Sequence, residues 1–226
     1  FVTGHLGYIG VHLVDLLEAE GHFVTGCDLG LFDGCEWEPC PRPDRELRKD
    51  TRDLCAEDLT GHDCVMHLAA LSNDPLGDLN KQFTYDINLH ASVDLAKAAK
   101  QAGVERFLFS SSCSLYGKPP SDDPVDETAP FGPITPYGES KIKVEQEVAP
   151  LADDSFSPTD LRNTTAYGWS PQLRGDIVVN NLAAYAFITG EVLIKSDGTP
   201  WRPLVHVEDI CRAFLAVMEA PRDIIH

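Results

Sequence analysis

The chain has 226 residues, of which 43% are hydrophobic, and this composition predicts a folded globular protein with an ordinary core. Its formal net charge of −18 argues against a nucleic-acid partner, because the 18 lysines and arginines form no basic run that could bind a phosphate backbone. No apolar stretch is long enough to span a bilayer and no signal peptide is evident, so we expect no membrane partner and a cytoplasmic location.

Strand and helix patterns alternate along the first half of the chain. Phe1–Thr3 has the pattern of the end of a strand, and after a glycine-rich turn a helical pattern runs from Val11 to Leu17 and stops at Gly21. A longer helical pattern covers Leu79–Gly103. Apolar runs typical of buried strands are Phe23–Asp28, Cys64–Ala70 and Arg106–Ser111. This alternation predicts an α/β fold, a Rossmann-type doubly wound parallel sheet with helices on both faces.

The second half of the chain is less regular. A loop rich in prolines and acids ends where a helix is predicted to begin, at Tyr137. Further predicted elements are a helix at Val178–Thr189, a strand at Val192–Lys195 and a final helix at Glu208–Glu219. We therefore expect a main domain over residues 1–160 and a smaller, incomplete C-terminal lobe over residues 161–226, interleaved with the main sheet.

The glycine-rich turn has the spacing Gly4-x-x-Gly7-x-x-Gly10 and leads into the first helix. Glycines at such a turn let the backbone approach a pyrophosphate at a helix N-terminus. Asp28 closes the second predicted strand, where a carboxylate can bind a ribose diol and repel a 2′-phosphate, which favours NAD over NADP. A turn that binds nothing and a solvated loop carboxylate are the alternative interpretations.

Tyr137 and Lys141 stand four residues apart on a predicted helix and 25 residues or more after Ser112. Side chains at this helical spacing share one face, so the ammonium can stabilise the phenolate of the tyrosine. A phenol tuned in this way can act as a general base near neutral pH. An exposed tyrosine–lysine pair on a helix surface is the alternative.

Other candidate side chains are interpreted structurally. His67 is expected to pack in the sheet as a core histidine with satisfied hydrogen bonds, and the seven cysteines lack the spacing of zinc ligands. We therefore expect no metal site.

The ordered set of motifs resembles that of the extended short-chain dehydrogenase/reductase family, in particular NAD-dependent nucleotide-sugar epimerases and dehydratases of the UDP-galactose 4-epimerase type. The resemblance covers essentially the whole chain, and its matching segments are Thr3 to Gly10, Asp28, Asp50-Thr51, His67 to Ala70, Asn88, Ser110 to Gly117, Pro136 to Lys141, Leu161-Arg162, Asp197 to Arg202 and Val205 to Asp209. It implies an NAD cofactor, a nucleotide-sugar substrate and a homodimer formed through the two long helices.

The resemblance also implies roles for individual residues. The catalytic residues would be Ser112, Tyr137 and Lys141. The cofactor would contact Gly4, Gly7, Tyr8, Ile9, Gly10, Asp28, Asp50, Thr51, Leu68, Ala69, Ala70, Asn88, Tyr137 and Lys141. The substrate would contact Ser112, Asn180, Asn181 and Arg202. Ser72, in a polar cluster beside the expected cofactor strand, could also contact substrate or lie in a plain turn.

One departure from the family pattern bears on the reaction. Dehydratases of this kind carry an Asp-Glu pair directly after the position of Ser112, whereas this chain has Cys113 and Ser114. Dehydration by that mechanism is therefore disfavoured, and an epimerase is the preferred prediction. A dehydratase, decarboxylase or ketoreductase of the same family is one alternative, and a non-catalytic NAD-binding regulatory protein is an alternative of another class.

Overall fold

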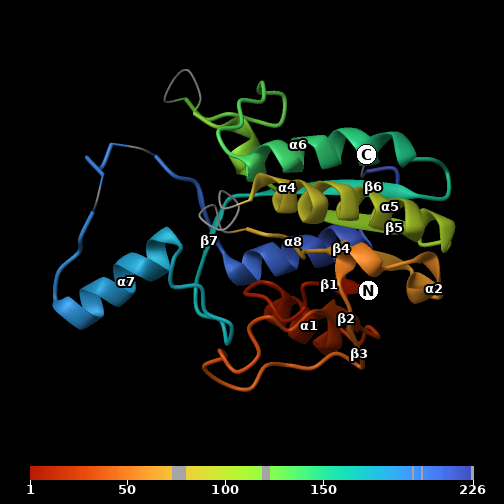
Figure 1. Cartoon of the computed structure of the whole chain (residues 1–226), viewed down its shortest axis with the longest axis horizontal. Coiled ribbons are helices and arrows are strands. Elements are labelled where there is room, and N and C mark those ends of the chain that lie inside the picture. The colour runs from red at the N-terminus through yellow and green to blue at the C-terminus, as the bar shows by residue number, and fades with distance from the viewer. Residues whose placement is uncertain (73–79, 119–122, 195, 200, 225–226) are drawn as a thin grey trace.

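The structure is a computed structural model that describes residues 1–72, 80–118, 123–194, 196–199 and 201–224 (Figure 1). Its main element is a sheet of six parallel strands in the order β3-β2-β1-β4-β5-β6. The strands are β1 (Val2–Thr3), β2 (Thr25–Asp28), β3 (Arg45–Arg48), β4 (Cys64–His67), β5 (Arg106–Ser112) and β6 (Ser157–Asn163). This arrangement confirms the predicted doubly wound sheet, and the strand order reverses between β1 and β4, where such folds bind ligands at the carboxyl ends of the strands.

Helices cover both faces of this sheet (Figure 1). On one face lie α2 (Ala56–Leu59), α4 (Lys81–Thr84), the π-helical turn η2 (Tyr85–His90), α5 (Ala91–Gln101) and α6 (Pro136–Val148). On the other face lie α1 (Gly10–Ala19) and α8 (Val207–Glu219). Two apolar clusters result, one on each face. Phe107 and Phe109 of β5 belong to one cluster and Leu108 belongs to the other. An apolar run without alternation is typical of a parallel strand that is covered on both faces.

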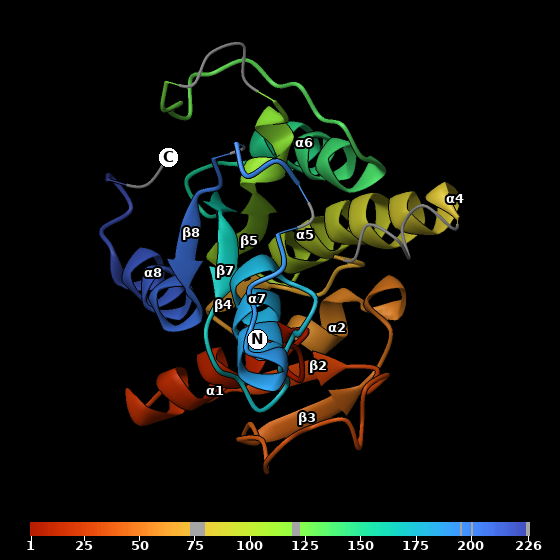
Figure 2. The ribbon, with the colours of Figure 1, turned by 90° about the vertical axis from the view of Figure 1, so that its left-hand side faces the viewer.

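A second, two-stranded parallel sheet joins β7 (Thr165–Tyr167) to β8 (Leu204–His206). Figure 2 shows these strands side by side, with α7 (Val178–Thr189) near the lower end of β7. Helix α7 contains no buried residue, and Figure 1 shows it standing away from the main sheet. None of the described helices is long and apolar enough to cross a membrane.

The structure refines several predicted elements and contradicts one. The strand predicted at Cys64–Ala70 ends at His67, and β3 and β7 were not predicted. The strand predicted at Val192–Lys195 is wrong for residues 192–194, which have no strand structure, and Lys195 lies outside the described residues, as does Leu79 of the predicted long helix. Strand β6 and helix α8 both belong to the layers of the main sheet, and the domain boundary at residue 160 stays a prediction.

Candidate functional site

The glycine turn brings the ends of β1 and β4 together. Gly4 has a φ of +72°, and a Cβ there would lie 2.8 Å from the backbone nitrogen of Ala69. A Cβ at Gly10 would lie 2.1 Å from the carbonyl oxygen of Gly4, so only glycine allows this turn to close. Helix α1 begins at Gly10, which has no side chain, so its N-terminus is open to a ligand at this position. Such a cradle of bare backbone fits the pyrophosphate of a dinucleotide.

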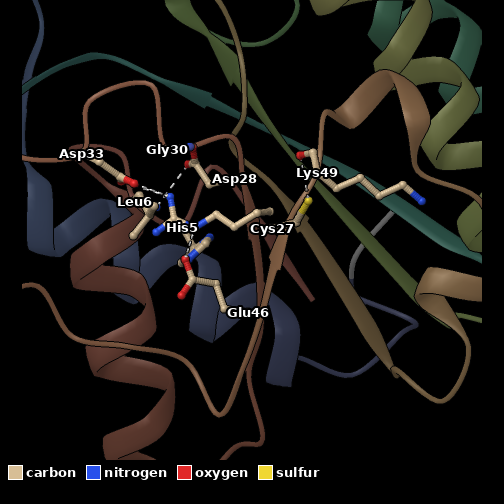
Figure 3. Close-up of polar contacts among 9 residues, drawn as sticks. His5, Leu6, Cys27, Asp28, Gly30, Asp33, Glu46 and Lys49 are labelled. Atoms are coloured by element: carbon tan, nitrogen blue, oxygen red, sulfur yellow. Dashed lines mark hydrogen bonds and ion pairs between the residues drawn. The ribbon is translucent and has the colours of Figure 1, made fainter.

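Asp28 faces this turn from the end of β2. Its Oδ1 accepts a hydrogen bond from the backbone of Gly30 at 2.9 Å, and its Oδ2 accepts one from the backbone of Leu6 at 3.3 Å (Figure 3). The carboxylate therefore has a fixed position at the end of β2, where an acidic residue contacts the adenosine ribose in folds of this kind, and its contact with a ribose stays a prediction.

Asp50 and Thr51 follow β3 along the chain. Asp50 accepts a hydrogen bond from the backbone of Arg52 at 2.9 Å and forms an ion pair with its guanidinium at 2.7 Å. Hydrogen bonding from Arg52 is the largest cause that lowers the pKa of Asp50. The carboxylate thus caps the N-terminus of the short 3₁₀ turn Thr51–Asp53. Its contact with adenine stays a prediction.

The backbone that follows β4 is held from two sides. Leu68 and Ala69 donate backbone hydrogen bonds of 3.2 Å to the main-chain oxygen and the hydroxyl of Thr3. Asn88, buried in η2, accepts from the nitrogen of Leu71 at 2.8 Å and donates to its oxygen at 3.0 Å. The π-helical turn places Asn88 under this loop, and such turns occur often at functional sites.

His67 is a core residue, as predicted. Its Nδ1 lies 2.6 Å from the hydroxyl of Thr3 and its Nε2 lies 2.8 Å from the hydroxyl of Ser92. Burial lowers the pKa of His67 to about 3, so the ring is neutral at physiological pH.

Ser112 ends β5, and the first turn of α6 packs against the residues that follow it. The Ser112 hydroxyl donates to the hydroxyl of Ser114 at 3.0 Å and accepts from its backbone nitrogen at 3.1 Å. Thr135 caps α6 by accepting a hydrogen bond from the nitrogen of Gly138 at 3.2 Å. A Cβ on Gly138 would lie 3.0 Å from the carbonyl oxygen of Ser114, so α6 approaches this turn closely. The helix thereby brings Tyr137 to the end of β5.

Lys141 lies one turn further along α6 and is almost fully buried. Its Nζ donates to the carbonyl oxygen of Ser110 at 2.6 Å and lies 5.5 Å from the ring centroid of Tyr137. Burial lowers the pKa of Lys141 to about 7, although the nearby carboxylates of Asp160 and Glu145 act in the opposite direction. The lysine therefore loses its proton near neutral pH rather than at the alkaline pH of an exposed lysine.

Residues after β7 and in α7 reach the glycine turn through Tyr8 and Asn180. The Tyr8 hydroxyl donates to the carbonyl oxygen of Gly168 at 2.7 Å, and burial raises the pKa of Tyr8. Asn180 of α7 donates to the Tyr8 hydroxyl at 3.4 Å and accepts from the nitrogen of Gly168 at 3.1 Å. Asn181 instead donates to the oxygen of Gly175 at 3.0 Å on the exposed side of the same loop.

The two remaining predicted substrate residues are Arg202, which is itself cationic, and Ser72, which contacts an arginine. Arg202 is exposed, and its charge acts on Cys113, where it opposes the larger effect of burial, which raises the pKa of that thiol. The Ser72 hydroxyl accepts a hydrogen bond from Nη1 of Arg174 at 2.9 Å.

Arg174, which the sequence did not indicate, contacts one of the predicted site residues. Its Nε pairs with Asp176 at 2.9 Å, which is the largest cause of its raised pKa, and the hydroxyls of Tyr137 and Tyr8 also interact with it electrostatically. Arg174 thus lies beside Ser72, and its charge acts on Tyr8 and Tyr137. Its partner Ser72 is 102 residues away in the sequence, and no local motif joins the two.

Comparisons with known proteins agree with this geometry. The family model for the NAD dependent epimerase/dehydratase family matches residues 1–226. The chain is 34% identical over 243 residues to the UDP-glucose 4-epimerase of Lacticaseibacillus casei, and the match covers 96% of this chain and 71% of that enzyme. It is 29% identical over 252 residues to the bifunctional protein GAL10 of Kluyveromyces lactis. That match covers 96% of this chain but only 36% of the longer protein.

Solved structures of related enzymes also resemble this chain in fold. The structure of MoeE5 in complex with UDP-glucuronic acid and NAD superposes with a TM-score of 0.83 at 34% identity, covering 97% of this chain and 72% of that chain. The NAD-dependent NDP-hexosamine 5,6-dehydratase TunA, involved in tunicamycin biosynthesis, superposes with a TM-score of 0.87 at 26% identity, covering 97% and 71%. The chain therefore belongs to the NAD-dependent epimerase/dehydratase family of enzymes.

Proposed function

We propose that this protein is a nucleotide-sugar epimerase that oxidises one sugar hydroxyl transiently and then restores it with the opposite configuration. One observation carries the proposal: helix α6 brings the Tyr137–Lys141 pair to the end of β5, where Ser112 lies, and the two residues directly after Ser112 are not carboxylates. The glycine turn and Asp28 lie at the ends of neighbouring strands, where they would hold the cofactor.

In the proposed mechanism each side chain has one task. Bound NAD would supply the acceptor, and later the donor, of a hydride. Tyr137 takes the proton of the sugar hydroxyl, and Ser112 holds that hydroxyl by a hydrogen bond. Lys141, when protonated, stabilises the phenolate of Tyr137 through the field of its ammonium. Gly4, Gly10 and Asp28 bind and orient the cofactor.

Dehydration is the less favoured outcome because the residues beside Ser112 lack the required acid and base. Burial raises the pKa of Cys113, so its thiol stays protonated at neutral pH and is a poor base. The Ser114 hydroxyl is engaged with Ser112 at 3.0 Å. Similarity in fold to the dehydratase TunA does not change this preference, because one fold supports several reactions and the site residues choose among them.

A UDP-sugar is the proposed substrate. This choice is supported by the names of the relatives, which include UDP-glucose 4-epimerases, and by neighbours solved with UDP-sugars. Arg174 and Arg202 provide positive charge for a diphosphate in a chain whose net charge is −18.

The test is a conversion assay. The full chain is incubated with NAD and, in separate reactions, with UDP, dTDP, GDP and CDP sugars, and the products are identified by mass spectrometry and NMR. We expect a UDP-sugar to yield an isomer of equal mass. A product that has lost water or carbon dioxide would contradict the proposal, and binding of NAD without conversion of any sugar would favour a regulatory protein.

We further propose a homodimer in the cytoplasm. The Tyr85 hydroxyl donates to Glu139 at 2.7 Å, which holds η2 against α6, and Phe83 of the adjoining α4 is 55% exposed. Large exposed aromatic side chains on paired helices suit a helix-to-helix interface. Seven free cysteines suit a reducing compartment. Light scattering on the purified protein tests the dimer, and we expect Phe83→Asp to shift it to the monomer.

A further inference from the structure

Arg48 stands directly beside Asp28 at the edge of the main sheet. The two residues are register partners at the carboxyl ends of the parallel strands β3 and β2. Asp28 is fixed at the predicted ribose position by its bonds to Gly30 and Leu6. A guanidinium in this position is well placed to meet a phosphate attached to that ribose.

Two carboxylates, those of Asp33 and Glu46, form ion pairs with the guanidinium of Arg48. Nη1 of Arg48 donates to both oxygens of Asp33, at 3.0 and 2.8 Å, and its Nε pairs with Glu46 at 2.6 Å. A Cβ on Gly30 would lie 1.8 Å from Nη1, so the guanidinium lies against the turn that follows Asp28. Figure 3 shows Asp28, Gly30, Asp33 and Glu46 in the same region, around the end of β2 and the turn that follows it.

The balance of charge decides what such a group can bind. Alone, an arginine is the residue best suited to bidentate contact with a phosphate. With Asp33 and Glu46 bound to it and Asp28 beside it, the cluster combines one positive charge with three negative ones. A further phosphate would meet repulsion from these carboxylates, and Nη1 and Nε of Arg48 already face Asp33 and Glu46.

We infer that Asp33 is a specificity-determining residue, which holds Arg48 away from a 2′-phosphate and so acts with Asp28 to select NAD over NADP. This inference rests on the proposed position of the adenosine ribose beside Asp28. The side chains of Arg48 and Asp33 are 44% and 58% exposed, and exposed ion pairs add little stability. Substitution of Asp33 should therefore leave the fold intact.

The experiment is a calorimetric titration of the full chain with NAD⁺ and, separately, with NADP⁺. Four proteins are compared: the unsubstituted chain, Asp33→Ala, the double variant Asp33→Ala with Arg48→Met, and Glu36→Gln. Glu36 is an exposed acid of the same loop and serves as the matched control for a lost charge. Thermal melts of all four check that each protein is folded.

We expect Asp33→Ala to tighten NADP⁺ binding relative to NAD⁺ by about tenfold or more, the size expected when a phosphate gains hydrogen bonds from a freed arginine. The double variant should lose this gain, and Glu36→Gln should not show it. If the unsubstituted chain binds NAD⁺ and Asp33→Ala leaves the ratio of the two affinities unchanged, the role of Asp33 is wrong while the proposed cofactor site stands. If the unsubstituted chain does not bind NAD⁺, the proposed cofactor site and the inference both fail.

Discussion

The ammonium of Lys141 donates a hydrogen bond to the main-chain carbonyl of Ser110, with 2.6 Å between Nζ and O. Ser110 stands two residues before Ser112 on β5, and Lys141 stands one turn after Tyr137 on α6. This bond therefore ties the helix that carries the proposed base to the strand that carries the proposed hydroxyl partner. It also holds the amine of Lys141 in a buried environment that lowers its pKa, which affects how the protein responds to pH.

Lys141 should make stability increase with pH. Burial lowers its pKa from 10.5 to about 7, so between these pH values the unfolded chain holds a proton that the folded chain has released. The free energy of unfolding then rises with pH above about 7, whereas below that pH both states are protonated and Lys141 contributes no change. Urea denaturation of the unsubstituted chain and of Lys141→Met over this range tests the prediction. We expect a smaller rise in the variant; parallel curves would show that Lys141 does not titrate near neutral pH.

Alanine substitutions in the glycine turn should differ in severity. A Cβ at Gly10 would lie 2.1 Å from the carbonyl oxygen of Gly4, and one at Gly7 would lie 3.2 Å from the same atom. Gly10→Ala should therefore abolish NAD binding and cost about 1–3 kcal/mol of stability or more, as overpacking does. Gly7→Ala should be milder in both respects. Calorimetric titration and thermal melting measure the two effects, and an equal or reversed ranking would contradict the described turn.

Asn88→Ala should loosen the loop that follows β4. The substitution removes the hydrogen bonds of 2.8 and 3.0 Å to the backbone of Leu71, and leaving such groups unpaired costs about 1–3 kcal/mol. Weaker NAD binding should accompany the loss. Gln82→Ala is the control, because Gln82 is exposed and its side chain donates to Asp86 at 2.8 Å on the helix surface, so its loss should cost about 0.5 kcal/mol or less. Equal losses in urea denaturation would mean that Asn88 has no special role.

Arg174→Ala should weaken substrate binding more than catalysis. The guanidinium bonds Ser72 at 2.9 Å and interacts electrostatically with Tyr137, so its removal takes a cation from the proposed diphosphate region. We expect the KM for the sugar nucleotide to rise by about tenfold, the size of a lost charged hydrogen bond, with a smaller change in kcat. Arg174→Lys should raise KM by an intermediate amount, because lysine keeps the positive charge but cannot make the bidentate hydrogen bonds of a guanidinium. Arg212→Ala, on the exposed face of α8, is the control and should leave KM unchanged.

Some elements could be predicted from the sequence because their pattern is local. The apolar run of β5 and the glycines around Gly7 indicate a covered parallel strand and a tight turn without reference to other residues. Strand β3 (Arg45–Arg48) has no such pattern, because it lies at the sheet edge and none of its residues is buried. It is recognisable as a strand only from its pairing with β2. The apolar residues 192–194 resemble a strand but are exposed, so hydrophobicity alone was a misleading signal there.

The same distinction applies to the candidate site. The spacing of Ser112, Tyr137 and Lys141 could be recognised as a motif because the three follow one another along the chain. The partners of these and other site residues could not, because folding brings them together from distant segments. Arg174 reaches Ser72 across 102 residues, and Arg48 meets Asp28 only through strand pairing.

The central claim is that Tyr137 starts a transient oxidation at a single sugar carbon, and an isotope experiment tests it most directly. A UDP-hexose deuterated at the carbon that is inverted is incubated with NAD and the full chain, and the product is analysed by NMR and mass spectrometry. We predict an epimer of unchanged mass that keeps its deuterium, with the rate falling by about a hundredfold or more in Tyr137→Phe. Loss of the deuterium to solvent, loss of water from the sugar, or undiminished turnover in Tyr137→Phe would contradict it.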